Sequence, residues 1–120
     1  MGLGYKIWLE STGRAFGWGP ARLLSGVERT GSLRQAAIEL GMSYSKAWLI
    51  IQAAYQRLGF SLLDRSVGGK LGGGSVVTAR GQDRLRRYQA LEIEVHAVLT
   101  EMFDRHFADR VEPAIDDSAS

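Results

Sequence analysis

The chain has 120 residues, a length typical of one domain, and its 45% hydrophobic and 23% charged residues are those of an ordinary globular protein. It contains no cysteine, which excludes disulfides and thiolate metal sites. The sequence has neither an apolar run of about 18 residues nor the pattern of a secretory signal, so we expect a cytoplasmic protein without a membrane span.

The net charge of +2 conceals an asymmetry between the two parts of the chain. Residues 1–88 carry 13 Lys and Arg against 5 Asp and Glu, a balance of +8, whereas residues 89–120 carry 2 against 8, a balance of −6. A basic body favours a polyanionic partner. Chance placement of solvated charge would produce the same pattern.

The first predicted element is an N-terminal β-hairpin. Tyr5, Ile7 and Leu9 alternate with more polar residues, which predicts a half-buried strand over 5–10. Residues 11–14 then form a turn, and residues 15–18 a weak return strand.

Three helices follow, over 20–30, 33–40 and 44–58, and each ends at a glycine. Pro20 suits the first turn of its helix, and Ser32 and Ser43 are good N-caps for the next two. The residues that we expect to face the core are Leu23, Leu24, Val27, Ala36, Ala37, Leu40, Ala47, Ile50, Ile51 and Ala54.

The second and third helices have the spacing of a helix-turn-helix. Ala37 provides the small residue that a steep helix crossing needs, Gly41 suits a turn with positive φ, and Ala47 seats the third helix on the second. Any three-helix bundle with glycine turns is the alternative.

A wing is predicted directly after the third helix. Residues 61–65 and 75–78 form two short strands, and the glycine-rich segment 67–74 connects them. Arg65 and Lys70 give this wing positive charge, and its glycines would let backbone amides approach phosphates. A solvent-exposed loop without function is the alternative.

The last predicted element is a long helix over 79–108, capped by Thr78 and about 45 Å long. Its apolar stripe is longer than one small body can cover, which favours a homodimer, although the protein's own hairpin could cover part of it. The predicted dimer interface contains Leu85, Tyr88, Leu91, Val95, Val98, Leu99, Met102 and Phe103.

These elements together predict an α+β, mainly α fold: a winged helix-turn-helix with an N-terminal β-hairpin and a long C-terminal dimerisation helix. We expect residues 1–78 to form the DNA-binding domain with its hairpin, and 79–108 the dimerisation helix of that same domain. Residues 109–120 are acidic and small, so we expect a disordered tail.

In a helix-turn-helix, the first turn of the third helix enters the major groove of double-stranded DNA. Lys46 and Ser45 could bond base edges or phosphates, and Trp48 could either contact bases or pack under the wing. Ser32 and Arg34 could bond a backbone phosphate. The candidate DNA-binding residues are Ser32, Arg34, Ser43, Tyr44, Ser45, Lys46, Trp48, Arg65 and Lys70.

Residues 20–88 resemble the N-terminal domain of molybdate-responsive transcription regulators, the ModE family, and more distantly the DNA-binding domain of LysR-type regulators. The resemblance rests on Gly31-Ser32, on the run from Gly41 to Trp48, and on the glycine-rich run from Gly68 to Thr78. It implies a dimeric transcriptional regulator, linked to molybdenum metabolism, that binds a palindromic operator. Molybdate-sensing members continue into oxyanion-binding domains that residues 1–120 do not include, so we expect a separate molybdate-sensing partner.

Two other functions compete with this interpretation: a winged-helix module that binds proteins without its own DNA specificity, and an oxyanion-binding protein that uses the wing as a nest. We expect no enzyme activity, because no nucleophile elbow or phosphate loop occurs. His96 and His106 lie ten residues apart without accompanying ligands, so we expect no metal and no cofactor.

Overall fold

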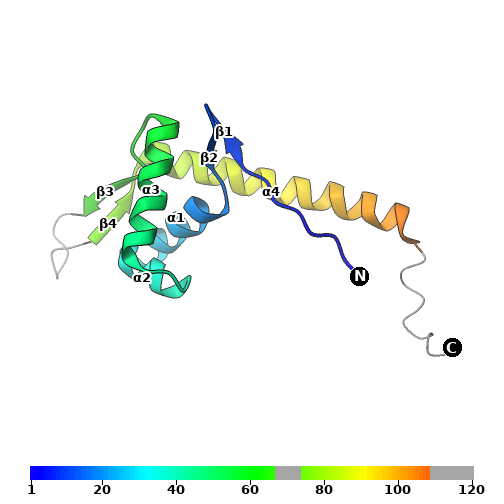
Figure 1. Cartoon of the computed structure of the whole chain (residues 1–120), viewed down its shortest axis with the longest axis horizontal. Helices are drawn as coiled ribbons and strands as arrows, with labels where there is room; N and C mark the ends of the chain where they lie inside the picture. Colours follow the sequence, from blue (N-terminus) through cyan, green and yellow to red (C-terminus); the bar gives the residue numbers. More distant parts are fainter. Residues whose placement is uncertain (67–73, 109–120) are drawn as a thin grey trace. The chain divides into compact units, whose positions relative to one another are not determined.

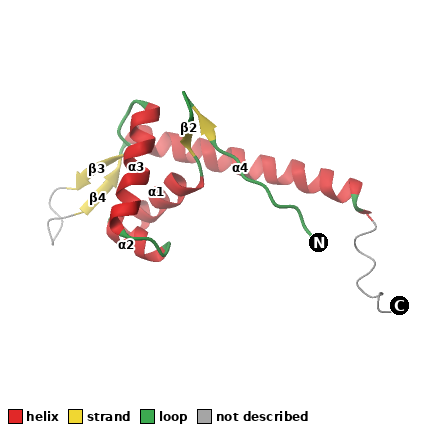
Figure 2. Cartoon of the chain, in the orientation of Figure 1, coloured by secondary structure: helices red, strands yellow, loops and turns green. Residues whose placement is uncertain are grey.

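The computed structural model describes residues 1–66 and 74–108, which are mainly helical with two small antiparallel hairpins (Figures 1 and 2). This confirms the predicted fold class, a winged helix-turn-helix. The elements in chain order are β1 (Leu9–Glu10), β2 (Arg14–Phe16), α1 (Trp18–Thr30), α2 (Leu33–Glu39), α3 (Tyr44–Leu58), β3 (Leu63–Ser66), β4 (Gly74–Val77) and α4 (Ala79–His106).

The helix-turn-helix forms as its caps predict. The Ser32 hydroxyl accepts the backbone N–H of Gln35 at 3.0 Å, and the Ser43 hydroxyl accepts that of Lys46 at 3.1 Å. Each bond satisfies one of the backbone donors that a helix start leaves without an intrahelical partner. Gly41 has φ +73°, a left-handed conformation that favours glycine, so it closes the turn between α2 and α3.

The N-terminal hairpin is shorter than predicted. Its strands β1 and β2 pair Leu9 with Phe16 and Glu10 with Arg14, with an irregularity between the two pairs. The predicted strand over 5–10 is therefore wrong at its start, and α1 begins at Trp18, two residues before Pro20. Pro20 still lies in the first turn, where its missing N–H breaks no intrahelical bond.

One hydrophobic core unites α1, α2, α3, the start of α4 and both hairpins. Gly26 of α1 lies so close to α2 that a Cβ added there would be 2.6 Å from the Cβ of Ala36. Leu40 and Ile50, predicted to face the core, are half-buried at its edge. The buried residues of the core are Phe16, Ala21, Leu23, Leu24, Val27, Leu33, Ala36, Ala37, Ala47, Ile51, Ala54, Phe60, Leu62, Val77, Leu85 and Tyr88.

The sequence assigned Leu85 and Tyr88 to a dimer interface, and the structure corrects this. Leu85 is 0% exposed and Tyr88 is 1% exposed, because both belong to the core just described. The Tyr88 ring meets Phe16 edge-on with ring centroids 5.4 Å apart, and its hydroxyl donates to the Ile7 carbonyl at 2.9 Å. The helical period could not distinguish this intramolecular partner from a second copy.

The chain divides into two compact units: one is Ile7–Gln89, and the other joins Met1–Lys6 to the chain from Ala90 onward. In the second unit, the Tyr5 hydroxyl and His96 Nδ1 are 2.8 Å apart, so the N-terminal segment bonds to α4. The helix ends at His106, two residues earlier than predicted. The predicted acidic tail, 109–120, lies outside the described residues.

The wing hairpin pairs β3 with β4 in an antiparallel register from Leu63–Val77 to Ser66–Gly74. The Ser75 N–H donates to the Gly31 carbonyl at 2.9 Å, which ties β4 to the turn before α2. The Thr78 hydroxyl accepts the Gly81 N–H at 2.9 Å and donates to the Ser61 carbonyl at 2.7 Å. Thr78 therefore caps α4, as predicted, and also holds the base of the wing together.

Candidate nucleic-acid interface

The first turn of α3 is open to solvent. Tyr44, Ser45 and Lys46 are all exposed, and Ser43 caps the helix directly before them. The opposite face, formed by Ala47, Ile51 and Ala54, is buried against the core. Burial of one face fixes the helix, so the exposed first turn is held on a rigid support rather than on a loop.

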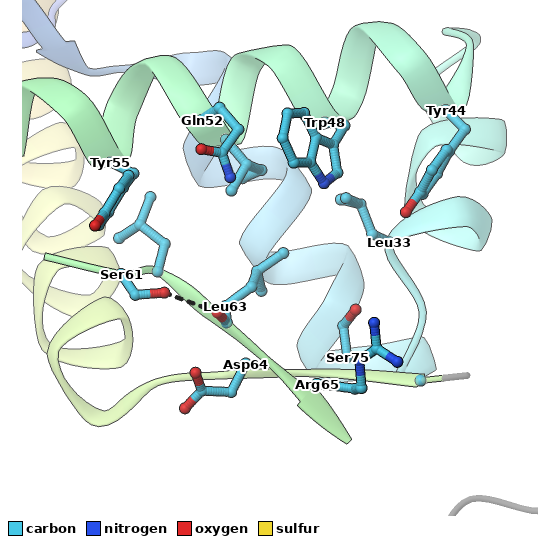
Figure 3. Close-up of a pocket in the computed structure, with 13 residues that line it drawn as sticks. Leu33, Tyr44, Trp48, Gln52, Tyr55, Ser61, Leu63, Asp64, Arg65 and Ser75 are labelled. Atoms are coloured by element: carbon cyan, nitrogen blue, oxygen red, sulfur yellow. Dashed lines mark hydrogen bonds between the residues drawn. The ribbon is translucent and has the colours of Figure 1, made fainter. Parts of the chain in front are cut away.

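A groove of about 480 Å³ runs between α3 and the wing (Figure 3). Tyr44, Trp48, Gln52 and Tyr55 follow one another along the α3 side, and Figure 3 shows their side chains on the edge of the helix nearest the wing strands. The groove is also lined by Leu33, Ile51, Ser61, Leu62, Leu63, Asp64, Arg65, Gly74 and Ser75. The aromatic rings together with Arg65 and Gln52 make a surface that can contact both sugars and phosphates.

Trp48 faces this groove and remains 46% exposed. The sequence left open whether Trp48 would pack under the wing or contact bases. Its ring lies between Tyr44 and Gln52 on α3, with the wing strands across the groove (Figure 3). The indole N–H has no partner among the described residues, so it can still donate to a ligand that enters the groove.

Arg34 of α2 extends this surface beyond the groove. Its guanidinium lies over the ring of Tyr44 at 4.4 Å from the ring centre, a cation–π contact that joins α2 to the first turn of α3. Ser32, also a candidate, is half-buried and uses its hydroxyl oxygen as the cap of α2. The contact keeps the Arg34 charge beside Tyr44 without neutralising it.

The cations of this surface are not paired with carboxylates in the described residues. Two nearby acids pair with other arginines: Glu39 bonds Arg29, and Glu28 bonds Arg86. Arg34, Lys46 and Arg65 form no ion pair within residues 1–66 and 74–108. Asp64 is the one acidic side chain that lines the groove among these residues. The positive charges of Arg34, Lys46 and Arg65 therefore remain available to an anion.

The Arg29–Glu39 pair connects the end of α1 to the end of α2. Arg29 Nη1 donates to Glu39 Oε2 at 3.2 Å, and Nη2 donates to Oε1. The hydrogen bond from Arg29 lowers the pKa of the Glu39 carboxyl, and the attraction between the two charges lowers it further. Both side chains are at the surface, where an ion pair contributes little to stability.

Gln52 and Tyr55 are the surface residues that the sequence did not single out. Both line the groove, and they continue the spacing of Tyr44 and Trp48 along one edge of α3. The signal for them was the helical period after Trp48, but only the position of the wing shows that this edge faces a groove. Lys70, the remaining predicted contact, lies outside the described residues.

Within residues 1–66 and 74–108, no group of three or more His, Asp or Glu side chains could hold a metal ion. No helix in the same part of the chain has the length and apolar character needed to cross a bilayer.

The chain is similar to known regulators over most of its described length. The family model for the bacterial regulatory helix-turn-helix protein, lysR family, matches residues 20–82. The molybdenum-pterin-binding protein MopB of Rhodobacter capsulatus is 39% identical over 92 residues, which cover 77% of this chain and 34% of that protein. The DNA-binding transcriptional dual regulator ModE of Escherichia coli strain K12 is 39% identical over 69 residues, 58% of this chain and 26% of that protein.

These curated relatives are much longer than the chain, which spans about a third of the length of MopB. Among solved structures, the CbnR_DBD–DNA complex matches with a TM-score of 0.54 and 24% identity over 76% of this chain and 94% of that one. That likeness concerns the fold. The family match covers the helix-turn-helix, the wing and the start of α4, and the chain therefore belongs to the lysR family of bacterial regulatory helix-turn-helix proteins.

Proposed function

We propose that this chain is a sequence-specific, DNA-binding transcriptional regulator of the cytoplasm and not an enzyme. The observation that carries the proposal is the open first turn of α3, with Tyr44, Ser45 and Lys46 exposed beside unpaired cations on a basic body. The family match and the ModE relative support it. In this arrangement the first turn of α3 enters the major groove.

Each candidate residue then has a role that follows from its chemistry. Lys46 and Ser45 bond base edges, where a lysine can donate to guanine O6 and N7. Arg34 and Ser32 contact the phosphate backbone beside α2, and Tyr44 lies against the same strand. Arg65, which lines the groove opposite α3, neutralises a phosphate, and we assign the same chemical role to Lys70.

A two-fold operator follows from a second proposal, that the chain is a homodimer. The exposed part of the α4 stripe supplies the contact, because apolar side chains in water favour a partner helix. Leu85 and Tyr88 are excluded because they are buried in the core. The proposed interface therefore contains Leu91, Val95, Val98, Leu99, Met102 and Phe103. Two copies related by a two-fold axis present two copies of α3 to a palindrome.

We place the target genes in molybdenum metabolism, on the names of the relatives. One is called a molybdenum-pterin-binding protein, and the ModE of Azotobacter vinelandii a molybdenum transport protein, 37% identical over 84 residues. The matched part is about a third of each relative. We propose that residues 1–120 supply the DNA contact and that a separate partner senses molybdate.

Selection of bound duplexes from a random library tests the function directly. We expect a palindrome, bound with an affinity that falls steeply as salt rises, because phosphate contacts release counterions. Recovery of no preferred sequence, together with no measurable affinity at low salt, would contradict the proposal and favour a protein-interaction module.

Variants of two lysines separate base contacts from phosphate contacts. Lys46→Ala should lower affinity for the selected operator and relax its sequence preference by about 1–3 kcal/mol. Lys70→Ala should weaken binding to all duplexes alike and reduce the salt slope by about 0.9 for each copy of the chain, about 1.8 for the proposed dimer. Lys6→Ala is the control, since Lys6 is an exposed lysine that is not among the candidate DNA-binding residues. Unchanged affinity of both variants for every duplex would show the groove assignment to be wrong.

A further inference from the structure

Leu49 is a large apolar side chain that the core does not use. It lies on α3 in the turn after Ser45 and is 64% exposed. One exposed leucine is ordinary on a protein surface. Its surroundings on α3 make this one unusual.

Leu49 belongs to an outer face of α3 that carries no charge between Lys46 and Arg57. Residues spaced by three and four positions share a helix face, and here the shared face is exposed throughout. It lies opposite the buried face of Ala47, Ile51 and Ala54. The members of this outer face are Ser45, Leu49, Ala53 and Gln56.

A helix face that meets only water normally carries charged residues. Between Ala47 and Gln56, however, α3 has no Lys, Arg, Asp or Glu. An uncharged face with small, apolar and amide side chains suits close contact with the apolar parts of base edges, because a charge pressed against an apolar group would lose its hydration without a partner. The same face carries Ser45, which the proposed function assigns to base contact.

The edges of the bases in the major groove carry one apolar group that a leucine can recognise, the C5-methyl group of thymine. Contact with this methyl group removes apolar surface of both partners from water. We propose that Leu49 is a specificity-determining residue that contacts a thymine methyl group in each half of the operator. This inference rests on the proposed function and names a chemical group that the operator must contain.

Replacement of thymine by deoxyuridine removes only this methyl group and leaves every hydrogen-bonding position of the base unchanged. Each thymine of the selected operator is replaced in turn, and binding of the full chain is measured for wild type and Leu49→Ala. At one position per half-site, we expect the replacement to weaken wild-type binding about fourfold, the equivalent of about 0.8 kcal/mol for one buried methyl group. Leu49→Ala should bind the thymine and deoxyuridine duplexes equally at that position.

Ile38→Ala is the matched control, because Ile38 of α2 is 61% exposed and lies outside the outer face of α3. It should keep the full wild-type response to deoxyuridine. If no replacement distinguishes wild type from Leu49→Ala, the inference is wrong, even when the operator itself binds. Failure of the proposed function is a separate result, in which the wild type binds no selected duplex and Lys46→Ala changes nothing.

Discussion

At the scale of single residues, Gly26 decides how closely α1 and α2 can approach. Its position in the middle of α1 would ordinarily cost stability, because glycine loses more backbone entropy than alanine, about 0.5–1 kcal/mol. Glycine is nevertheless needed where α1 crosses α2, because an added Cβ would be 2.6 Å from the Ala36 Cβ and 3.2 Å from its Cα. Ala36 is 1% exposed and has no room to move away.

Gly26→Ala should therefore destabilise the protein by about 1–3 kcal/mol, the usual cost of overpacking a core. Equilibrium unfolding in urea measures the change. Gly19→Ala is the control in the same helix, because its Cβ would lie 3.5 Å from Ile50, an ordinary contact. Equal stability of the Gly26 and Gly19 variants would mean that α2 moves aside at little cost.

Some site residues could be predicted because their signals are local, whereas others depend on contacts between distant parts of the chain. Ser43 and Lys46 follow from the cap signature and the helical period, both of which are local. Gln52 and Tyr55 required the wing to lie across from α3, which depends on contacts between residues far apart in the chain. Trp48 was ambiguous for the same reason.

At the scale of elements, the serine caps fix where α2 and α3 begin. Ser43→Ala removes the bond to the Lys46 N–H and should destabilise the protein by about 1 kcal/mol. Thermal unfolding checks this. Ser45→Ala, on the same helix, replaces an exposed serine with no hydrogen bond in the described residues and should change stability by less than about 0.5 kcal/mol. A smaller effect of Ser43→Ala than of Ser45→Ala would rule out the cap as the start signal.

The Arg29–Glu39 ion pair between α1 and α2 makes a pH-dependent contribution to the free energy of unfolding. The pKa of Glu39 is lowered in the folded protein, mainly by its hydrogen bond from Arg29, so the contribution is present above the ordinary glutamate pKa and is lost as the pH falls through the lowered value. Glu39→Gln should lower the melting temperature slightly at about pH 7, and this difference from the wild type should shrink as the pH falls below the ordinary glutamate pKa of about 4.3. Glu94→Gln, without an ion pair in the described residues, should show no such dependence on pH.

At the scale of the whole molecule, a charge substitution tests whether the exposed stripe of α4 is the interface of the proposed dimer. Val98 is 53% exposed, and a charge there would be buried in the proposed interface without a partner. We expect the wild type to sediment as a dimer and Val98→Glu as a monomer at micromolar concentrations. Thr100→Glu, exposed on the other side of the same helix, is the control and should remain dimeric. A wild type that sediments as a monomer would contradict the proposal.

The sequence by itself determined the helices, their caps and the turn at Gly41, because these depend on residues a few positions apart. It could not assign the partner of an apolar stripe: Leu85 and Tyr88 were expected at a dimer interface and instead lie in the core with Phe16. Only the tertiary structure decided this, and also which edge of α3 faces the wing, because burial depends on where distant segments meet. Periodicity indicates that a face needs a partner, but it does not say which one.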